Sequence, residues 1–199
     1  MGAGRNAVKL RITLEGINPA PWREIDVRLS SSLKTLHEAI QAAFLWQNSH
    51  LWEFQIGEKD YGTDFCVDEG DDIGRARTMR IAKIVDNNIK EFSYVYDYGD
   101  YWVHNIEILS LIHVEDNVRL PRVVAGERAA PPDDIGGAPG YEYFLEEILN
   151  NPKHPERENY EHFIDDPLVG TFNPEDMKSS IVNIMMKSVA RAKPKSRAA

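Results

Sequence analysis

Residues 7–29 read AVKLRITLEGINPAPWREIDVRL, two alternating segments separated by a proline-rich break. In the first segment, apolar side chains occupy every second position from Val8 to Leu14, with charged or polar residues between them. The alternation stops at INPAPW and resumes from Ile25 to Leu29. A period of two is typical of a strand with one buried face, and proline steps favour a turn. The stretch therefore predicts a long hairpin.

The segment after the hairpin changes to helical spacing. Its apolar stripe is Leu33, Leu36, Ile40 and Phe44. Ser32 is a suitable N-cap, and His37 lies on or beside the stripe. A strand then follows, with Trp52, Phe54 and Ile56 on one face. The order strand, strand, helix, strand resembles the opening of a β-grasp arrangement.

A second hairpin is predicted in FSYVYDYGDYWVHNIEI, residues 92–108. Its strands join at Gly99-Asp100, because a tight turn prefers Gly, Asn or Asp. Alternation places His104 on the apolar face with Trp102, so we expect a core histidine that is hydrogen-bonded to a neighbour. The same alternation directs Asp97 towards solvent.

The other segments predict less regular structure and then helices. Residues 58–75 are expected to form an acidic loop, and MRIAKIV (79–85) fits either a short helix or an extended segment. Residues 113–139 are rich in Pro, Gly and charge, which predicts an irregular connection. Three helical segments follow, at 141–151, 155–164 and 173–190.

The last of these helices is expected to start with Asn173 as N-cap and Pro174 as its first residue. Its predicted apolar face is Met177, Ile181, Ile184 and Met185. Strands early and helices late favour an α+β fold, with a mixed or antiparallel sheet and a C-terminal helical layer. We expect the following organisation: a flexible start (1–6), one domain (7–186) with a sheet-rich part (7–112), the irregular connection and a helical part (140–186), and a disordered basic tail (187–199).

Composition narrows the class of protein. A net charge of −9 argues against broad binding to a phosphate backbone, so nucleic acid is not the expected partner. No apolar run suits a membrane span or a signal peptide, which predicts a cytoplasmic protein without membrane contact. The single cysteine, Cys66, excludes an intrachain disulfide and is expected to be a small buried side chain. The tail from Lys187 carries five basic residues, and a solvated end is favoured over weak contact with nucleic acid.

Several polar residues are candidates for chemistry, because metal binding and acid–base catalysis need His, Asp and Glu side chains that converge. Asp133 and Asp134 occupy PPDDIGG, a loop whose prolines and glycines define its shape. The candidate binding groove comprises His50, Trp52, Glu53, Asp97, Asp100, Trp102, His104, Asp134 and Tyr141. No cofactor is predicted; a divalent metal stays open, with His50, Asp100 and His104 as its candidate ligands.

These stretches occur together in one order: LRITLEGINPAPWREIDV, LHEAIQAAFLWQNSHLWEFQIG, DEGD, FSYVYDYGDYWVHNIEI, PRVVAGERAAPPDDIGGAPGYEYFLEEI and FNPEDM. The chain thereby resembles, over residues 7–178, the Ri-plasmid ORF-three-like family of plasmids and insertion elements. The resemblance implies a small α+β domain and no particular activity. Many relatives carry cysteines where this chain has Ala130 and Ile135, so a thiolate site is not implied here.

The resemblance also marks individual positions of the chain. They are Pro21, Trp22, His50, Glu53, Phe54, Tyr96, Asp97, Gly99, Asp100, Trp102, His104, Gly126, Glu127, Pro131, Pro132, Asp134, Gly136, Gly137, Gly140, Tyr141 and Glu142. What these positions share with the family is mainly the shape and the acids of the Gly/Pro loop, which favours a structural or recognition role.

Three functions compete on these observations. The favoured one is a non-enzymatic binding module of mobile-element type that takes a protein, a peptide or a small ligand in the candidate groove. The second is a metal-dependent hydrolase or nuclease, whose site would be His50, Glu53, Asp97, Asp100 and His104. It requires these side chains to meet near one point. The third is weak nucleic-acid binding through the basic tail.

Overall fold

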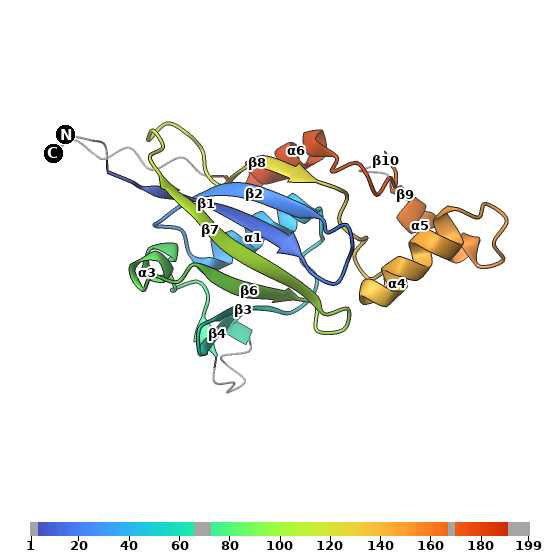
Figure 1. Cartoon of the computed structure of the whole chain (residues 1–199), viewed down its shortest axis with the longest axis horizontal. Coiled ribbons are helices and arrows are strands. Elements are labelled where there is room, and N and C mark those ends of the chain that lie inside the picture. The colour runs from blue at the N-terminus through green and yellow to red at the C-terminus, as the bar shows by residue number, and fades with distance from the viewer. Residues whose placement is uncertain (1–3, 66–72, 167–169, 191–199) are drawn as a thin grey trace.

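A computed structural model describes residues 4–65, 73–166 and 170–190, and its centre is an eight-stranded sheet with the order β5-β4-β3-β6-β7-β1-β2-β8. The strands are β1 (Ala7–Leu14), β2 (Trp22–Arg28), β3 (Trp52–Ile56), β4 (Lys59–Gly62), β5 (Gly74–Arg75), β6 (Glu91–Tyr96), β7 (Trp102–Ile112) and β8 (Arg122–Glu127). Helix α1 (Leu33–Phe44) lies across one face of this sheet (Figure 1).

The remaining elements are short and follow the sheet. They are α3 (Ile81–Asp86), α4 (Gly137–Tyr143), the π-helical η1 (Phe144–Leu149), the 3-10 helix η2 (Arg157–Tyr160), α5 (Glu161–Ile164), a small ribbon of β9 (Asp165–Asp166) and β10 (Gly170–Thr171), and α6 (Ser179–Val189). Figure 1 shows α4 and α5 projecting from one end of the sheet. None of the described helices has the length and apolar character needed to cross a bilayer.

The predicted first hairpin is present and forms the middle of the sheet. β1 pairs antiparallel with β2, with Leu10 opposite Ile25, and on its other side with β7. The alternating residues from Val8 to Leu14 are fully buried, as the sequence pattern requires. The α+β class is confirmed; all neighbouring pairs of the large sheet are antiparallel except β4 and β5. The chain runs strand, strand, helix, strand up to Ile56, and β6 and β7 separate β3 from β1.

A closed ring of hydrogen bonds holds the chain after α1. The backbone N–H of Asn48 donates to Gln41 Oε1 (2.9 Å), and Gln41 Nε2 donates to the hydroxyl of Tyr94 (3.2 Å). That hydroxyl lies 2.7 Å from His37 Nδ1, and His37 Nε2 lies 2.6 Å from Asn48 Oδ1. Because the amide oxygen can only accept, His37 carries its proton on Nε2 and accepts from Tyr94 at Nδ1. Every donor in the ring therefore has one acceptor, and the loop that begins at Leu45 is fixed to α1 and β6.

A buried arginine ties the end of α1 to the sheet. Arg23 is 1% exposed, and its guanidinium donates to the carbonyls of Ala43 (2.8 Å), Trp22 (2.8 Å) and Glu127 (2.9 Å). Burial lowers the pKa of Arg23 to about 10, so it stays charged at neutral pH. The last carbonyls of a helix carry partial negative charge, which stabilises a cation there. One side chain therefore connects α1, β2 and the strand β8.

Two stretches expected to be irregular contain regular structure. The segment 58–75 includes β4 and β5, and residues 66–72 lie outside the described part, as does Cys66. The segment 113–139 includes β8, which pairs with β2. The local composition did not predict a strand here, because β8 is stabilised by its pairing with β2. MRIAKIV, which fitted two alternatives, contains the helix α3.

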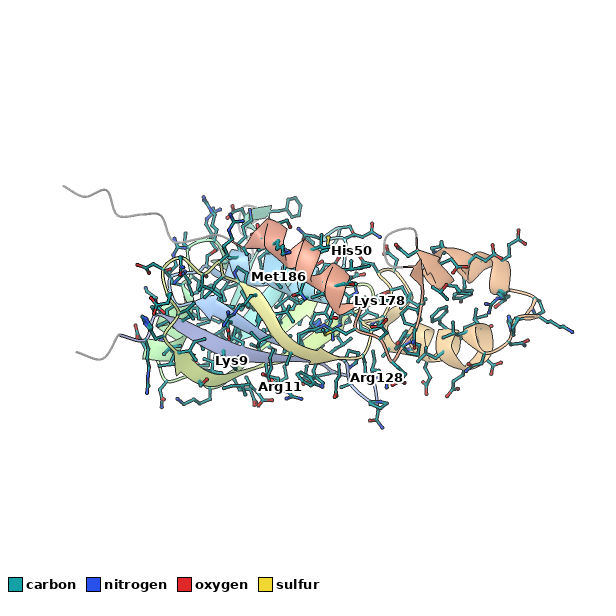
Figure 2. The ribbon with its side chains drawn as sticks, turned by 90° about the horizontal axis from the view of Figure 1, so that it is seen from above. Lys9, Arg11, His50, Arg128, Lys178 and Met186 are labelled. Atoms are coloured by element: carbon teal, nitrogen blue, oxygen red, sulfur yellow. The ribbon has the colours of Figure 1, made fainter. Side chains whose placement is uncertain are left out.

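The last helix starts later than expected and presents a different face. α6 begins at Ser179, because Asn173 closes a turn with Asp176 and the carbonyl of Pro174 accepts from Ala129 N (3.1 Å). Its buried residues are Val182 and Met186, whereas the predicted face residues Ile184 and Met185 are 63% and 40% exposed. Figure 2 shows α6 lying along β8, with Lys178 at its start and Met186 on the helix. Docking against α1 and β8 selected the buried face. The basic tail lies outside the described residues from Arg191 onward.

The buried histidines predict a loss of stability in mild acid. Burial lowers the pKa of His37 and of His104 to about 3, whereas an unfolded histidine titrates near 6.5. Below 6.5 the unfolded chain binds protons that the folded chain does not, so the stability present at neutral pH is lost progressively until pH 3. We expect urea unfolding to show a loss of about 4 kcal/mol between pH 7 and pH 5 from the two residues together. His104→Leu should roughly halve this pH dependence, and His162→Gln, at an exposed position, should leave it unchanged. Equal stability of the unmodified chain at pH 7 and pH 5 would contradict the prediction.

Because Arg23 connects three elements, its replacement should lower the free energy of unfolding by a large amount. In Arg23→Met, the buried carbonyl of Ala43 and the part-buried carbonyls of Trp22 and Glu127 lose this donor, and we expect the free energy of unfolding to fall by about 3 kcal/mol. The matched control is Arg11→Met, because Arg11 is half-buried and its guanidinium lies 3.9 Å over the Trp22 ring. We expect that variant to lose less than about 1 kcal/mol in the same urea titration. Similar losses for both variants would refute a special role for Arg23.

Candidate metal centre

Three loops bring one histidine and two aspartates together near the start of β3 and the end of β6. His50 precedes β3, Asp97 opens the turn between β6 and β7, and Asp134 lies in the loop before α4. His50 Nε2 is 2.8 Å from Asp134 Oδ1 and 3.6 Å from Asp97 Oδ2. One ligand atom from each residue lies within 4.8 Å of the other two. The position of His50 is labelled in Figure 2.

The turn that carries Asp97 differs from the predicted tight turn. Its positive φ angles occur at Asp97 (58°) and Tyr101 (56°), not at Gly99-Asp100. Asp97 Oδ1 accepts from Gly99 N (2.8 Å), and Tyr101 N donates to the Asp97 carbonyl (2.6 Å). Asp97 is 6% exposed, so the expectation that it faces solvent is wrong. The strand pattern ends one residue before it, and the left-handed backbone then turns its second oxygen towards His50.

Asp133 holds the third loop in place. Its Oδ2 accepts from Gln47 N (3.1 Å) and from the Tyr96 hydroxyl (3.3 Å). Trp46 Nε1 donates to the carbonyl of Pro131 (2.9 Å), which fixes the same loop two residues earlier. Burial raises the pKa of Asp133, and the nearby Asp134 carboxylate raises it further. With its neighbour fixed in this way, Asp134 has a φ of 63° and is 63% exposed on its side-chain atoms.

The hydroxyl of Tyr96 joins two of the three loops. It accepts from Ser49 N (3.2 Å) and donates to Asp133 Oδ2, so one oxygen sets the distance between the His50 loop and the Asp134 loop. Burial raises the pKa of Tyr96 to about 12, and the hydroxyl keeps its proton at neutral pH. Tyr96 is among the positions marked by the family resemblance, but it was not among the candidate groove residues predicted from the sequence. The available signal is that a tyrosine on the buried face of a strand needs a partner for its hydroxyl.

His50 Nε2 is shielded from solvent and has no hydrogen-bond partner among the described residues, although Asp134 Oδ1 lies only 2.8 Å away. The contact lies within ion-pair distance but does not have the geometry of a hydrogen bond, and the three potential ligand atoms stay within 4.8 Å of one another. The His50 side chain is 29% exposed and Asp134 is more exposed, which leaves one side of the cluster open to solvent.

The structure places the other predicted site residues elsewhere. Trp102, His104 and Tyr141 are all at most 3% exposed and belong to the core, so they do not line a groove. His104 is the expected core histidine: its Nδ1 lies 3.3 Å from the Tyr94 carbonyl, and its ring packs against Phe44 and Trp46. As a result, His104 does not converge with His50.

The polar members of the predicted groove have separate partners. Asp100 Oδ2 accepts from Gly136 N (3.1 Å), and Glu53 accepts from the Tyr98 hydroxyl (2.9 Å). The apolar Trp52 stacks on His37. Of the five residues required by the hydrolase hypothesis, only His50 and Asp97 meet, and Asp134 completes the cluster instead. The surface beside it includes Leu51, Tyr98 and Tyr101, which are 37%, 45% and 59% exposed.

Comparisons with known proteins agree with the motif resemblance. Residues 6–180 match a family model described as plasmid pRiA4b ORF-3-like protein. The uncharacterized protein y4hQ of Sinorhizobium fredii is 34% identical over 151 residues, which are 75% of this chain and 76% of that protein. A crystal structure of a protein of unknown function from Methanosarcina mazei Go1 aligns with a TM-score of 0.73 at 31% identity, covering 86% of this chain and 94% of that chain. The resemblance inferred from the sequence is confirmed, and these relatives carry no described activity.

Because the Tyr96 hydroxyl joins two loops, its removal should lower the free energy of unfolding. Tyr96→Phe removes the partner of Ser49 N and one partner of Asp133, and we expect a loss of about 1–3 kcal/mol in the free energy of unfolding. Hydrogen exchange at the Ser49 amide should accelerate in the same variant. Tyr98→Phe is the control, because that tyrosine is exposed, and it should change stability by no more than about 0.5 kcal/mol. Unchanged exchange at Ser49 in Tyr96→Phe would show that the hydroxyl does not hold the loop.

Proposed function

The chain belongs to the plasmid pRiA4b ORF-3-like family, and we propose that it is a non-enzymatic binding module that holds a divalent metal ion at His50, Asp97 and Asp134. The observation that carries the proposal is the convergence of three potential ligand atoms from three separate loops, one of them a shielded imidazole nitrogen without a hydrogen bond. Imidazole suits zinc and other transition metals, and carboxylates suit manganese and magnesium. A mixed set of one imidazole and two carboxylates favours a first-row divalent ion such as Mn²⁺ or Zn²⁺.

The local charge supports a bound cation. Asp97, Asp133 and Asp134 lie close together, and no Lys or Arg within the described ranges forms an ion pair with any of them. Like charges at such a site repel and raise the free energy of the ionised state. A divalent ion balances the two carboxylate ligands, because His50 binds as a neutral imidazole.

The backbone supports the same proposal. Asp97 and Asp134 both adopt left-handed backbone angles, which an aspartate tolerates better than most residues but which still cost free energy. Strained backbone of this kind is often retained where it aims a side chain at a function. Here it aims both carboxylates at His50 Nε2.

The open side of the cluster gives the ion a role in binding. Three protein ligands would leave room for a further donor in the coordination shell, and the exposure of Asp134 would give such a donor access from solvent. A ligand with an oxygen or nitrogen donor can complete the coordination and contact the exposed Tyr98 and Tyr101. We favour binding over hydrolysis because Glu53, Asp100 and His104, which the hydrolase hypothesis requires, have other partners.

Metal binding by the purified protein tests the proposal. Titration calorimetry with Mn²⁺ and Zn²⁺ should give one site per chain, and a metal at one hundred times its dissociation constant should raise the free energy of unfolding by about 2.7 kcal/mol. Asp97→Asn and Asp134→Asn should each weaken binding at least about tenfold, because each removes a charged ligand. Glu53→Gln is the matched control; it removes a nearby carboxylate that is not in the cluster, and should bind metal as the unmodified chain does.

Two outcomes would contradict the proposal. Absence of any saturable binding, or equal loss in Glu53→Gln and Asp134→Asn, would reject the metal centre. Turnover of ester or phosphodiester substrates by the metal-loaded protein, lost in Asp134→Asn, would keep the ion but replace the binding module with a hydrolase.

A further inference from the structure

A second site lies on the other side of the loop that carries His50. A cavity of about 200 Å³ opens between α1, the start of β3 and the segments that follow β4 and β5. Its lining residues are Lys34, His37, Glu38, Asn48, Trp52, Gly62, Thr63, Asp64, Ala76 and Arg77. None of the three metal-centre residues lines it, so the cavity is a separate feature of the fold.

The floor of the cavity is apolar and rigid. The Trp52 indole stacks on the His37 imidazole with ring centres 3.9 Å apart and planes 11° apart. Both side chains are buried, and His37 is held on its two nitrogens by the hydrogen-bonded ring. Ala76 adds only a methyl group to the lining, whereas the space over Gly62 is occupied by the Ile73 side chain, whose Cδ1 would lie 2.7 Å from a Cβ at that position. Trp52 is 6% and His37 is 2% exposed, so an apolar group of a small ligand can reach only the part of this pair that borders the cavity.

The rim carries charges of both signs, and only some of them are already paired. Asp64 Oδ1 accepts from Arg75 (3.2 Å) and from Arg77 (2.9 Å), so one carboxylate is shared by two guanidinium groups and this side of the rim keeps a net positive charge. Lys34 and Glu38 lie four residues apart on α1, one turn above the other, and both face the cavity. Across the described part of the chain, neither side chain forms a hydrogen bond or an ion pair. A lysine that precedes a glutamate by four residues is the weaker order for a helical pair.

Asn48 adds a third available group. Its amide oxygen accepts from His37 Nε2, which fixes the orientation of the amide and leaves its NH₂ group as a donor at the rim. The cavity thus offers an ammonium, a carboxylate and an amide donor above an apolar floor.

We propose that this cavity binds a free α-amino acid with an apolar side chain. The ammonium group of such a ligand complements Glu38, its carboxylate complements Lys34 and the amide of Asn48, and its side chain packs on Trp52. A purely anionic ligand would be repelled by Glu38, and a purely cationic one would be repelled by Lys34 and by the arginines at Asp64. The volume is below the range of about 300–1,000 Å³ that is usual for larger ligands, which fits a single amino acid.

The test uses L-phenylalanine, N-acetyl-L-phenylalanine and L-phenylalaninamide as probes. Their binding to the full chain is measured by calorimetry and by Trp fluorescence. We expect L-phenylalanine to bind. Each capped form lacks one charge and should bind at least about tenfold more weakly. Lys34→Gln and Glu38→Gln should each weaken binding of L-phenylalanine by a similar factor. Both positions lie at the surface, so the variants keep the fold; Lys90→Gln and Glu91→Gln are the matched controls and should bind normally.

The outcomes separate this proposal from the metal centre. Asp134→Asn, and metal-free protein, should bind L-phenylalanine as well as the unmodified chain does. Equal binding of the free and both capped forms would show that only the apolar floor is used, and would overturn the proposal. The absence of saturable binding at millimolar L-phenylalanine and L-leucine would overturn it as well.

Discussion

The hydrogen-bonded ring of Gln41, Tyr94, His37 and Asn48 is the interaction on which both proposed sites depend. Its members at His37, Gln41 and Tyr94 are buried, and each hydrogen bond of the ring satisfies a group of the next member, so breaking one member leaves another unsatisfied in a low-dielectric environment. The ring fastens the loop after α1 to a helix on one side and to a strand on the other. From this loop, His50 points towards the metal centre, and Asn48 towards the cavity.

The same loop separates two sites with different electrostatics. On one side, His37 is kept neutral by burial and forms part of the apolar floor of the cavity. On the other side, His50 is half-buried and faces two carboxylates. The difference arises from solvent access: a histidine enclosed by aromatic rings loses the hydration of its charged form, and its pKa falls. Two imidazoles thirteen residues apart in sequence therefore take unlike roles.

Much of the fold follows from patterns that a single strand or helix carries within itself. The alternation from Val8 to Leu14 and the helical spacing from Leu33 to Phe44 each matched the observed element, because burying one face is a local property of the pattern. Ser32 caps its helix as expected, accepting from Thr35 N. The strand β8 and the buried face of α6 were not predicted. The first exists through pairing with β2, and the second through docking on α1, and neither interaction is visible in the segment itself.

The sequence by itself determined the α+β class, the two hairpins, and which residue types are available for chemistry. It could not determine which of them meet. Asp97 was expected in solvent and lies buried beside His50, while Asp100 and His104, equally plausible by residue type, are held by a backbone amide and by the aromatic core. The physical reason is that ligand geometry depends on three loops whose ends belong to distant strands. Their distances are set by Tyr96, Asp133 and Trp46, through contacts that exist only once the sheet has formed.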